Sequence, residues 1–111
     1  MANPRFILKR SSDTQFFFNL LASNGEVILT SERYTTKASA LKGTAAVGAN
    51  APFPERYFKY NASNDQPYFV LRAANQEALG TSELYSSNTA RDGGIDAVMR
   101  AAVVAEVVDA T

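Results

Sequence analysis

The stretch that decides the fold is FNLLASNGEVILTSERY at residues 18–34, which returns 51 positions later as FVLRAANQEALGTSELY at residues 69–85. Nine of these 17 pairs are identical, and 16 of 47 pairs match without a gap when residues 5–51 are set against 56–102. Self-similarity at one fixed offset indicates an internal duplication. Because two copies are too few for a solenoid, we expect them to pack against each other about a pseudo-twofold axis.

Each copy is predicted to contain three strands followed by a helix. The turn residues Asn24-Gly25 favour a two-residue hairpin, since both tolerate a positive φ, and the counterpart Asn75-Gln76 is a weaker signal. Hydroxyl side chains at residues 34–36 and 85–88 offer N-caps for the helices. The expected strands are residues 5–10, 16–22 and 26–32, then 56–61, 67–73 and 77–83, and the helices are 37–50 and 89–101.

Small residues recur along one stripe of the two helices. The identities are Gly43/Gly94, Ala46/Ala97, Val47/Val98 and Ala51/Ala102. Glycine inside a helix costs about 1 kcal/mol relative to alanine. Its recurrence therefore predicts that each helix backbone lies close to the sheet, although common ancestry of the copies would also explain it.

The β-branched run Val103–Val108 predicts a last strand. At the 51-residue offset it overlaps residues 52–57, so the strand after the first helix and the first strand of the second copy are expected to be one element. The chain is thus predicted to be a single α+β domain over residues 1–111, with repeats at about 4–54 and 55–111.

These motifs resemble the YegP-like family of small bacterial tandem-repeat domains. The residues that carry the resemblance are Asn24–Thr35, Pro67–Asn75 and the inner glycine of each helix. The resemblance implies two tandem β3-α-β repeats that form a single mostly antiparallel sheet, with two helices on one face and C-terminal strands exchanged between the repeats. It implies no activity, because none is established for that family. Gln76 in place of the turn glycine and the Asp92-Gly93-Gly94 run depart from the pattern in the second copy, where an irregular helix start is expected.

The composition argues against an enzyme. The chain has no histidine and no cysteine, which removes the commonest general base, the usual partner of a catalytic serine, thiol nucleophiles and thiolate metal ligands. No phosphate-binding glycine loop or serine elbow is present. We therefore expect no catalytic residues, no cofactor and no metal, and the absence of a long apolar run predicts a soluble, cytoplasmic protein without a membrane anchor.

The net charge of the chain indicates which kinds of partner it can bind. Eleven basic and eleven acidic residues cancel over the whole chain, with six basic and three acidic residues in 1–54 and five basic and eight acidic residues in 55–111. A neutral chain gives poor support for binding a phosphate backbone. The opposite charges of the halves are read as drift between the copies or as weak mutual attraction.

Cross-strand pairing in a two-residue hairpin predicts two sheet faces. Phe18, Leu20, Ala22, Val27 and Leu29 would face the helices with their second-copy counterparts. The opposite face would remain open and would include Ile28 and Leu79. If the protein has a binding site, we expect it on this open face where the copies meet; the candidate residues are Phe17, Thr30, Glu32, Tyr68, Arg72, Thr81 and Glu83.

Three functions remain open for this face. The leading one is a non-catalytic binding or protein-interaction module, with a protein partner or self-association. Thr-Ser-Glu occurs at residues 30–32 and 81–83, so a twofold axis could bring Glu32 and Glu83 together for acid–base work or for binding a cation. Exposed Phe17 and Tyr68 could stack single-stranded bases, but the same two glutamates would repel phosphate, so nucleic acid is not the expected partner.

Overall fold

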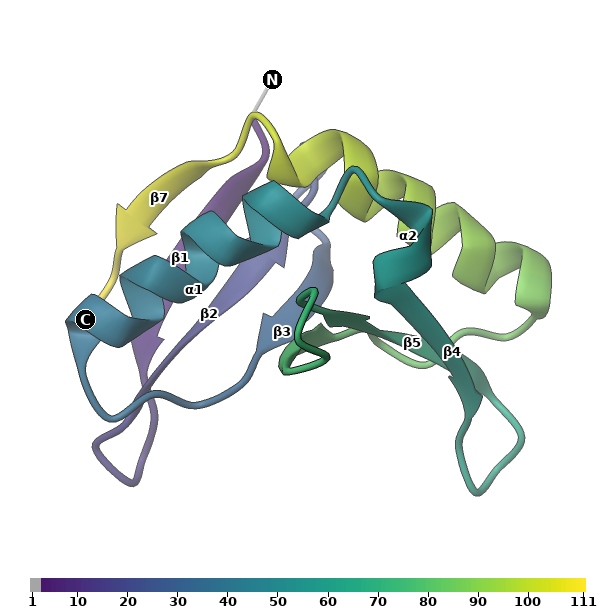
Figure 1. Cartoon of the computed structure of the whole chain (residues 1–111), viewed down its shortest axis with the longest axis horizontal. Coiled ribbons are helices and arrows are strands. Elements are labelled where there is room, and N and C mark those ends of the chain that lie inside the picture. The colour runs from purple at the N-terminus through teal and green to yellow at the C-terminus, as the bar shows by residue number, and fades with distance from the viewer. Residues whose placement is uncertain (1–2) are drawn as a thin grey trace.

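The computed structural model describes residues 3–111 and has seven strands, two α-helices and one short 3₁₀-helix. The two copies repeat the same order of elements (Figure 1). The first copy contains β1 (Arg5–Arg10), β2 (Phe16–Leu21), β3 (Val27–Ser31) and α1 (Lys37–Asn50). The second contains η1 (Pro54–Arg56), β4 (Tyr57–Asn61), β5 (Pro67–Arg72), β6 (Ala78–Thr81), α2 (Asn88–Ala102) and β7 (Glu106–Asp109).

All seven strands form one sheet in the order β4-β5-β6-β3-β2-β1-β7. The two copies join where β3 pairs antiparallel with β6, and Thr30 lies opposite Thr81 there. Those two residues are also 51 positions apart, so the pseudo-twofold axis of the duplication passes between them. The predicted fold, a mostly antiparallel sheet with two helices on one face, is confirmed.

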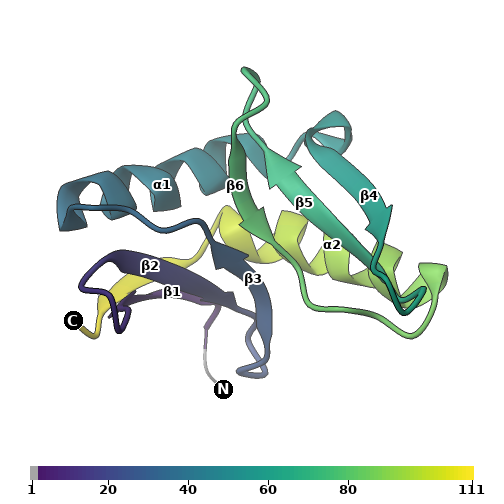
Figure 2. The ribbon, with the colours of Figure 1, turned by 90° about the horizontal axis from the view of Figure 1, so that it is seen from below.

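The last strand crosses from the second copy to the first. β7 runs parallel to β1, with Glu106 opposite Arg5 and Asp109 opposite Leu8, whereas the remaining strand pairs are antiparallel. The helices also bridge the copies, because α1 contacts β1 and β2 as well as β5 and β6, and α2 contacts β2, β3 and β5 (Figure 2). Each copy therefore completes its core only with elements of the other.

The helix starts are capped as predicted, and the inner glycines allow a close approach, but to a tyrosine rather than to the sheet itself. Thr36 and Ser87 accept hydrogen bonds from the backbone N–H groups of Ser39 and Ala90, which caps α1 and α2. A Cβ added at Gly43 would collide with the Tyr34 ring and hydroxyl. The same collision occurs between Gly94 and Tyr85, so the close approach is to a tyrosine lying between helix and sheet.

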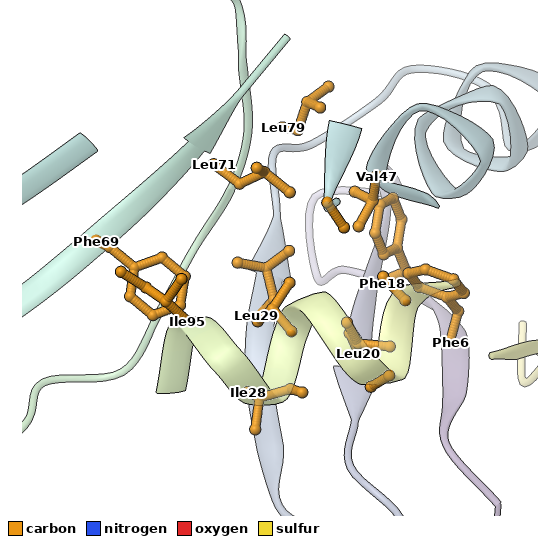
Figure 3. Packing of buried hydrophobic residues seen from close by; sticks show 14 of the residues in the cluster. Phe6, Phe18, Leu20, Ile28, Leu29, Val47, Phe69, Leu71, Leu79 and Ile95 are labelled. Atoms are coloured by element: carbon orange, nitrogen blue, oxygen red, sulfur yellow. The ribbon is translucent and has the colours of Figure 1, made fainter. Parts of the chain in front are cut away.

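These tyrosines stack on the largest buried side chains. The ring centroids of Phe18 and Tyr34 are 6.4 Å apart with an interplanar angle of 9°, and Phe69 and Tyr85 repeat both values. Phe18 and Phe69 are fully buried, and Figure 3 shows them in the two halves of one continuous core. Burial raises the pKa of Tyr34 and of Tyr85 above the usual tyrosine value, and a neighbouring glutamate adds to it.

The twofold symmetry breaks at the axis. Leu29 and Gly80 are equivalent positions, and each lies one residue from the central threonine pair. A Cβ built on Gly80 would lie 2.7 Å from Leu29 Cγ and 3.1 Å from the Thr30 carbonyl oxygen. Only one of the two positions can therefore carry a large side chain in this backbone arrangement.

The prediction of two-residue hairpins is wrong. In the β2–β3 hairpin, Ala22 N–H donates to the Glu26 carbonyl and Gly25 N–H donates to the Ala22 carbonyl, which leaves a three-residue loop. Such a loop needs a left-handed residue at its end. The other hairpins share this geometry, and the left-handed residues are Thr14 (φ 64°), Gly25 (φ 87°), Asp65 (φ 65°) and Gln76 (φ 71°).

The longer loop shifts the strand register and corrects the face assignment. Leu20 lies opposite Leu29 as predicted, but Val27 lies opposite Leu21 rather than Ala22, so Ile28 is bulged. A bulge lets two successive residues face the same side. Ile28 therefore joins the core with Leu29, and Leu79 does so after the same bulge in the second copy, so neither is on the open face (Figure 3).

Two predicted elements of the second copy also change. The last strand is Glu106–Asp109, because Val103 and Val104 form the turn that follows α2 and are exposed. α2 begins at Asn88 and continues without interruption through Asp92-Gly93-Gly94, so the expected irregular start is wrong. The Ser87 cap and the contact of Gly94 with Tyr85 account for its regularity.

The strained turn in the second copy generates a stability prediction. Gln76→Gly should raise the free energy of unfolding by about 0.5–1 kcal/mol, because the 1–2 kcal/mol cost of a left-handed side chain exceeds the entropy that glycine adds to the unfolded chain. Urea unfolding monitored by circular dichroism measures it. As a control, Asn75→Gly in the same turn should destabilise, since Asn75 Oδ1 accepts a hydrogen bond from Glu77 N–H. A lower stability for Gln76→Gly would contradict the turn geometry.

The crossed strand generates the second prediction. Deleting residues 103–111 should lower the unfolding free energy by about 2–4 kcal/mol, since several backbone hydrogen bonds at 0.5–1.5 kcal/mol each are lost with β7. Phe6 and Leu8, both buried in β1, would then lie at an open sheet edge. An unchanged melting midpoint for the truncated chain would show that β7 does not close the first copy.

Candidate functional site: the open sheet face

The face of the sheet opposite the helices is crossed by one continuous row of cross-strand neighbours. The row is symmetric about the central threonine pair, with an aliphatic or aromatic residue at each end. It consists of Ile7, Asn19, Thr30, Thr81, Val70 and Phe58. Asn19 Nδ2 donates to Thr30 Oγ1 at 2.9 Å, which satisfies a side chain that is buried although it lies on this face.

Aromatic residues gather on the second-copy half of this face. Tyr60 and Tyr68 stack with ring centroids 5.6 Å apart, and the Arg72 guanidinium lies 5.3 Å from the Phe58 ring centroid. Arg72 also donates to Tyr60 Oη at 3.2 Å and to the Gln76 carbonyl at 3.0 Å. Phe58 and Tyr60 are 36% and 37% exposed, so a partner can reach the rings. We call Phe58, Tyr60, Tyr68 and Arg72 the aromatic–arginine cluster.

The two glutamates of the repeated Thr-Ser-Glu motif do not form a site together. Glu32 and Glu83 lie two residues beyond Thr30 and Thr81 in opposite directions of an antiparallel pair. Their Cα atoms are therefore separated by roughly 13 Å along the strands. Within residues 3–111, no three Asp or Glu residues are placed to hold a metal ion together.

The remaining candidate residues divide between the two halves. Thr30 and Thr81 meet at the axis, but Phe17 lies on β2 and Tyr68 on β5, with β3 and β6 between them. Of the predicted set, only Tyr68 and Arg72 belong to the aromatic–arginine cluster. The structure therefore gathers one group in the second copy rather than two equivalent groups at the axis.

Sequence reasoning missed Phe58 and Tyr60. The signal was present, because the alternation in YFKYN places both on the face opposite buried Tyr57. At the equivalent positions the first copy has Ile7 and Lys9, so its half of the open face lacks the counterparts of both rings. The two halves of the open face therefore differ, and the paired rings of Phe58 and Tyr60 belong to the second copy.

The duplicated architecture matches a known protein family. The family described as "Domain of unknown function (DUF1508)" matches residues 11–57 and again 62–109. The chain belongs to the DUF1508 family. In residues 3–111 no helix has the length and apolar content to cross a bilayer.

Similar proteins match most of the chain, and a solved structure shares its fold. A UPF0339 protein of Shewanella oneidensis is 51% identical over 104 residues, 94% of both chains, and the UPF0339 protein YegP of Escherichia coli O157:H7 is 54% identical over 93 residues, 84% of both chains. The solution structure of E. coli yegP, described as a protein of unknown function, has a TM-score of 0.93 at 47% identity and covers 100% of this chain and 96% of its own. These relatives are uncharacterised, so they assign no specific function.

Proposed function

We propose that this DUF1508 chain is a non-catalytic binding module that recognises a protein partner through the open sheet face, in the bacterial cytoplasm expected from the sequence. The observation that carries the proposal is the aromatic–arginine cluster on a face that no helix of residues 3–111 covers. Tyrosine and arginine, like tryptophan, are enriched among the residues that contribute most of the binding energy at protein interfaces. Preordered rings also lose little conformational entropy on binding.

The cluster is arranged as a contact surface rather than as reactive chemistry. Arg72 is held by Phe58, Tyr60 and the Gln76 carbonyl, so its guanidinium is oriented before any partner arrives. Val70 lies between the cluster and the central threonines but is buried, so the apolar surface that a partner can reach is formed by the rings of Phe58 and Tyr60. A contiguous apolar patch of this kind marks an interaction surface in soluble proteins.

Single-stranded nucleic acid is the second candidate, because stacked tyrosines beside an arginine also suit bases. The neutral whole-chain charge argues against it. The two candidates differ in salt dependence, since phosphate binding weakens steeply as salt rises.

The test uses the purified full chain as bait in an extract of the native cell, followed by calorimetry with the purified partner. The double variant Tyr68→Ala/Arg72→Ala should bind at least tenfold more weakly, because hot-spot truncations typically cost 2 kcal/mol or more. Leu41→Ala is the matched control, since Leu41 is exposed on α1, outside the open face. The partner should be recovered with unchanged mass, as expected for binding without turnover.

Three results would contradict the proposal. The first is equal affinity of the cluster variant and wild type with loss in Leu41→Ala. The second is steeply salt-dependent binding of a single-stranded oligonucleotide that outcompetes the protein partner. The third is conversion of the partner that disappears in Glu32→Gln or Glu83→Gln, which would favour the catalytic alternative.

A further inference from the structure

The two ends of the sheet are not equivalent, although the repeats are. In the first copy, β1 is covered on its outer side by β7. The 51-residue offset makes residues 55–58 the counterpart of β7, but those residues form the end of η1 and the start of β4. The segment that would supply an eighth strand forms part of β4 itself, so within residues 3–111 the outer edge of β4 has no strand partner.

The pairing of β1 with β7 shows, by the repeat, which backbone groups of β4 point to its outer edge. Ala110 N–H donates to the Leu8 carbonyl at 2.8 Å, so the backbone of Leu8 points outward. Lys59 is the equivalent residue of β4. Its N–H and C=O therefore point to the open edge, and an added strand parallel to β4 would pair with both.

A groove accompanies the edge on the helix side of the sheet. Its volume is about 250 Å³, and it is lined between β4 and α2 by Tyr57, Lys59, Asp92, Ile95, Asp96 and Met99. In the first copy, Val107 of β7 lies beside Phe6, the counterpart of Tyr57. The groove thus provides room for the inward side chains of an added strand.

Charge distinguishes the two edges. Lys37 at the start of α1 forms a 2.8 Å ion pair with Asp109 of β7, which holds the pKa of that carboxyl well below its usual range. At the β4 edge, α2 carries Asp92 and Asp96 where α1 carries Leu41 and Ala45. Asp92 pairs with Lys59 and Arg91, whereas Asp96 forms no ion pair within residues 3–111.

We infer that the outer edge of β4 binds an extended segment of a partner protein as an added parallel strand, with a branched aliphatic side chain beside Tyr57 and a lysine or arginine beside Lys59. The inference rests on the proposed function, because it names the kind of partner. A second copy of this chain fits less well, since β7 would bring Asp109 against Asp92 and Asp96. Alternate side chains of the added strand would lie on the open face next to Phe58 and Tyr60.

The test titrates two synthetic peptides of residues 105–111 into the isotope-labelled full chain, one native and one with Asp109→Lys. The Asp109→Lys peptide should shift the amide resonances of β4 and of residues 92–99, and the native peptide should bind at least threefold more weakly. Asp96→Lys in the protein should abolish that preference. Lys59→Pro should abolish binding because it removes the outward N–H, a change that an edge strand tolerates, whereas Lys59→Ala should retain binding.

A peptide N-methylated at residue 110 repeats the Lys59→Pro test without altering the protein, since it removes the donor to the Lys59 carbonyl. The inference is overturned if neither peptide shifts β4 at millimolar concentration, if shifts appear only at β1, or if dilution alone moves the β4 resonances through self-association. Partner binding that is lost in Tyr68→Ala/Arg72→Ala but is kept in Lys59→Pro would overturn this inference and leave the proposed function intact.

Discussion

The antiparallel pairing of β3 with β6 is the constraint on which the rest of the structure depends. It joins the two copies at Thr30 and Thr81 and places the duplication axis inside the sheet. Close packing allows no second leucine there, because Leu29 already occupies the space beside Gly80. The copies have therefore diverged at the axis, where identical side chains would collide.

That junction explains why one chain forms one sheet with unlike ends. With the copies fixed about the axis, β7 reaches β1, and each helix contacts strands of both copies. The linker after α1 continues through η1 into β4, so no strand in the described part of the chain covers the opposite edge. The aromatic–arginine cluster and the β4–α2 groove lie on the two sides of this same strand.

Local signals in the sequence were enough to predict the repeat, the strand order within each copy, both helix caps and the burial of Phe18 and Phe69, because each depends on periodicity or on one side chain. The β2–β3 loop was mispredicted because Asn-Gly also favours a two-residue turn in which both residues have a positive φ, whereas only Gly25 has one here, and Gln76 gives no comparable signal in the second copy. That error moved Ile28 and Leu79 to the wrong face, because register depends on loop length.

The candidate site could be predicted only in part. Tyr68 and Arg72 were found because the repeat alignment drew attention to β5, but the cluster depends on cross-strand pairing with Phe58 and Tyr60 of β4. The separation of Glu32 from Glu83 depends on the position of the axis along β3, which the offset alone does not give.

The most direct test of the account is a double-mutant cycle at the β3–β6 junction, measured as the free energy of unfolding in urea. Gly80→Leu should destabilise wild type by about 1–3 kcal/mol through overpacking, yet it should stabilise the Leu29→Gly variant by filling the vacated space. Equal destabilisation in both backgrounds would contradict the packing at the junction of the two copies.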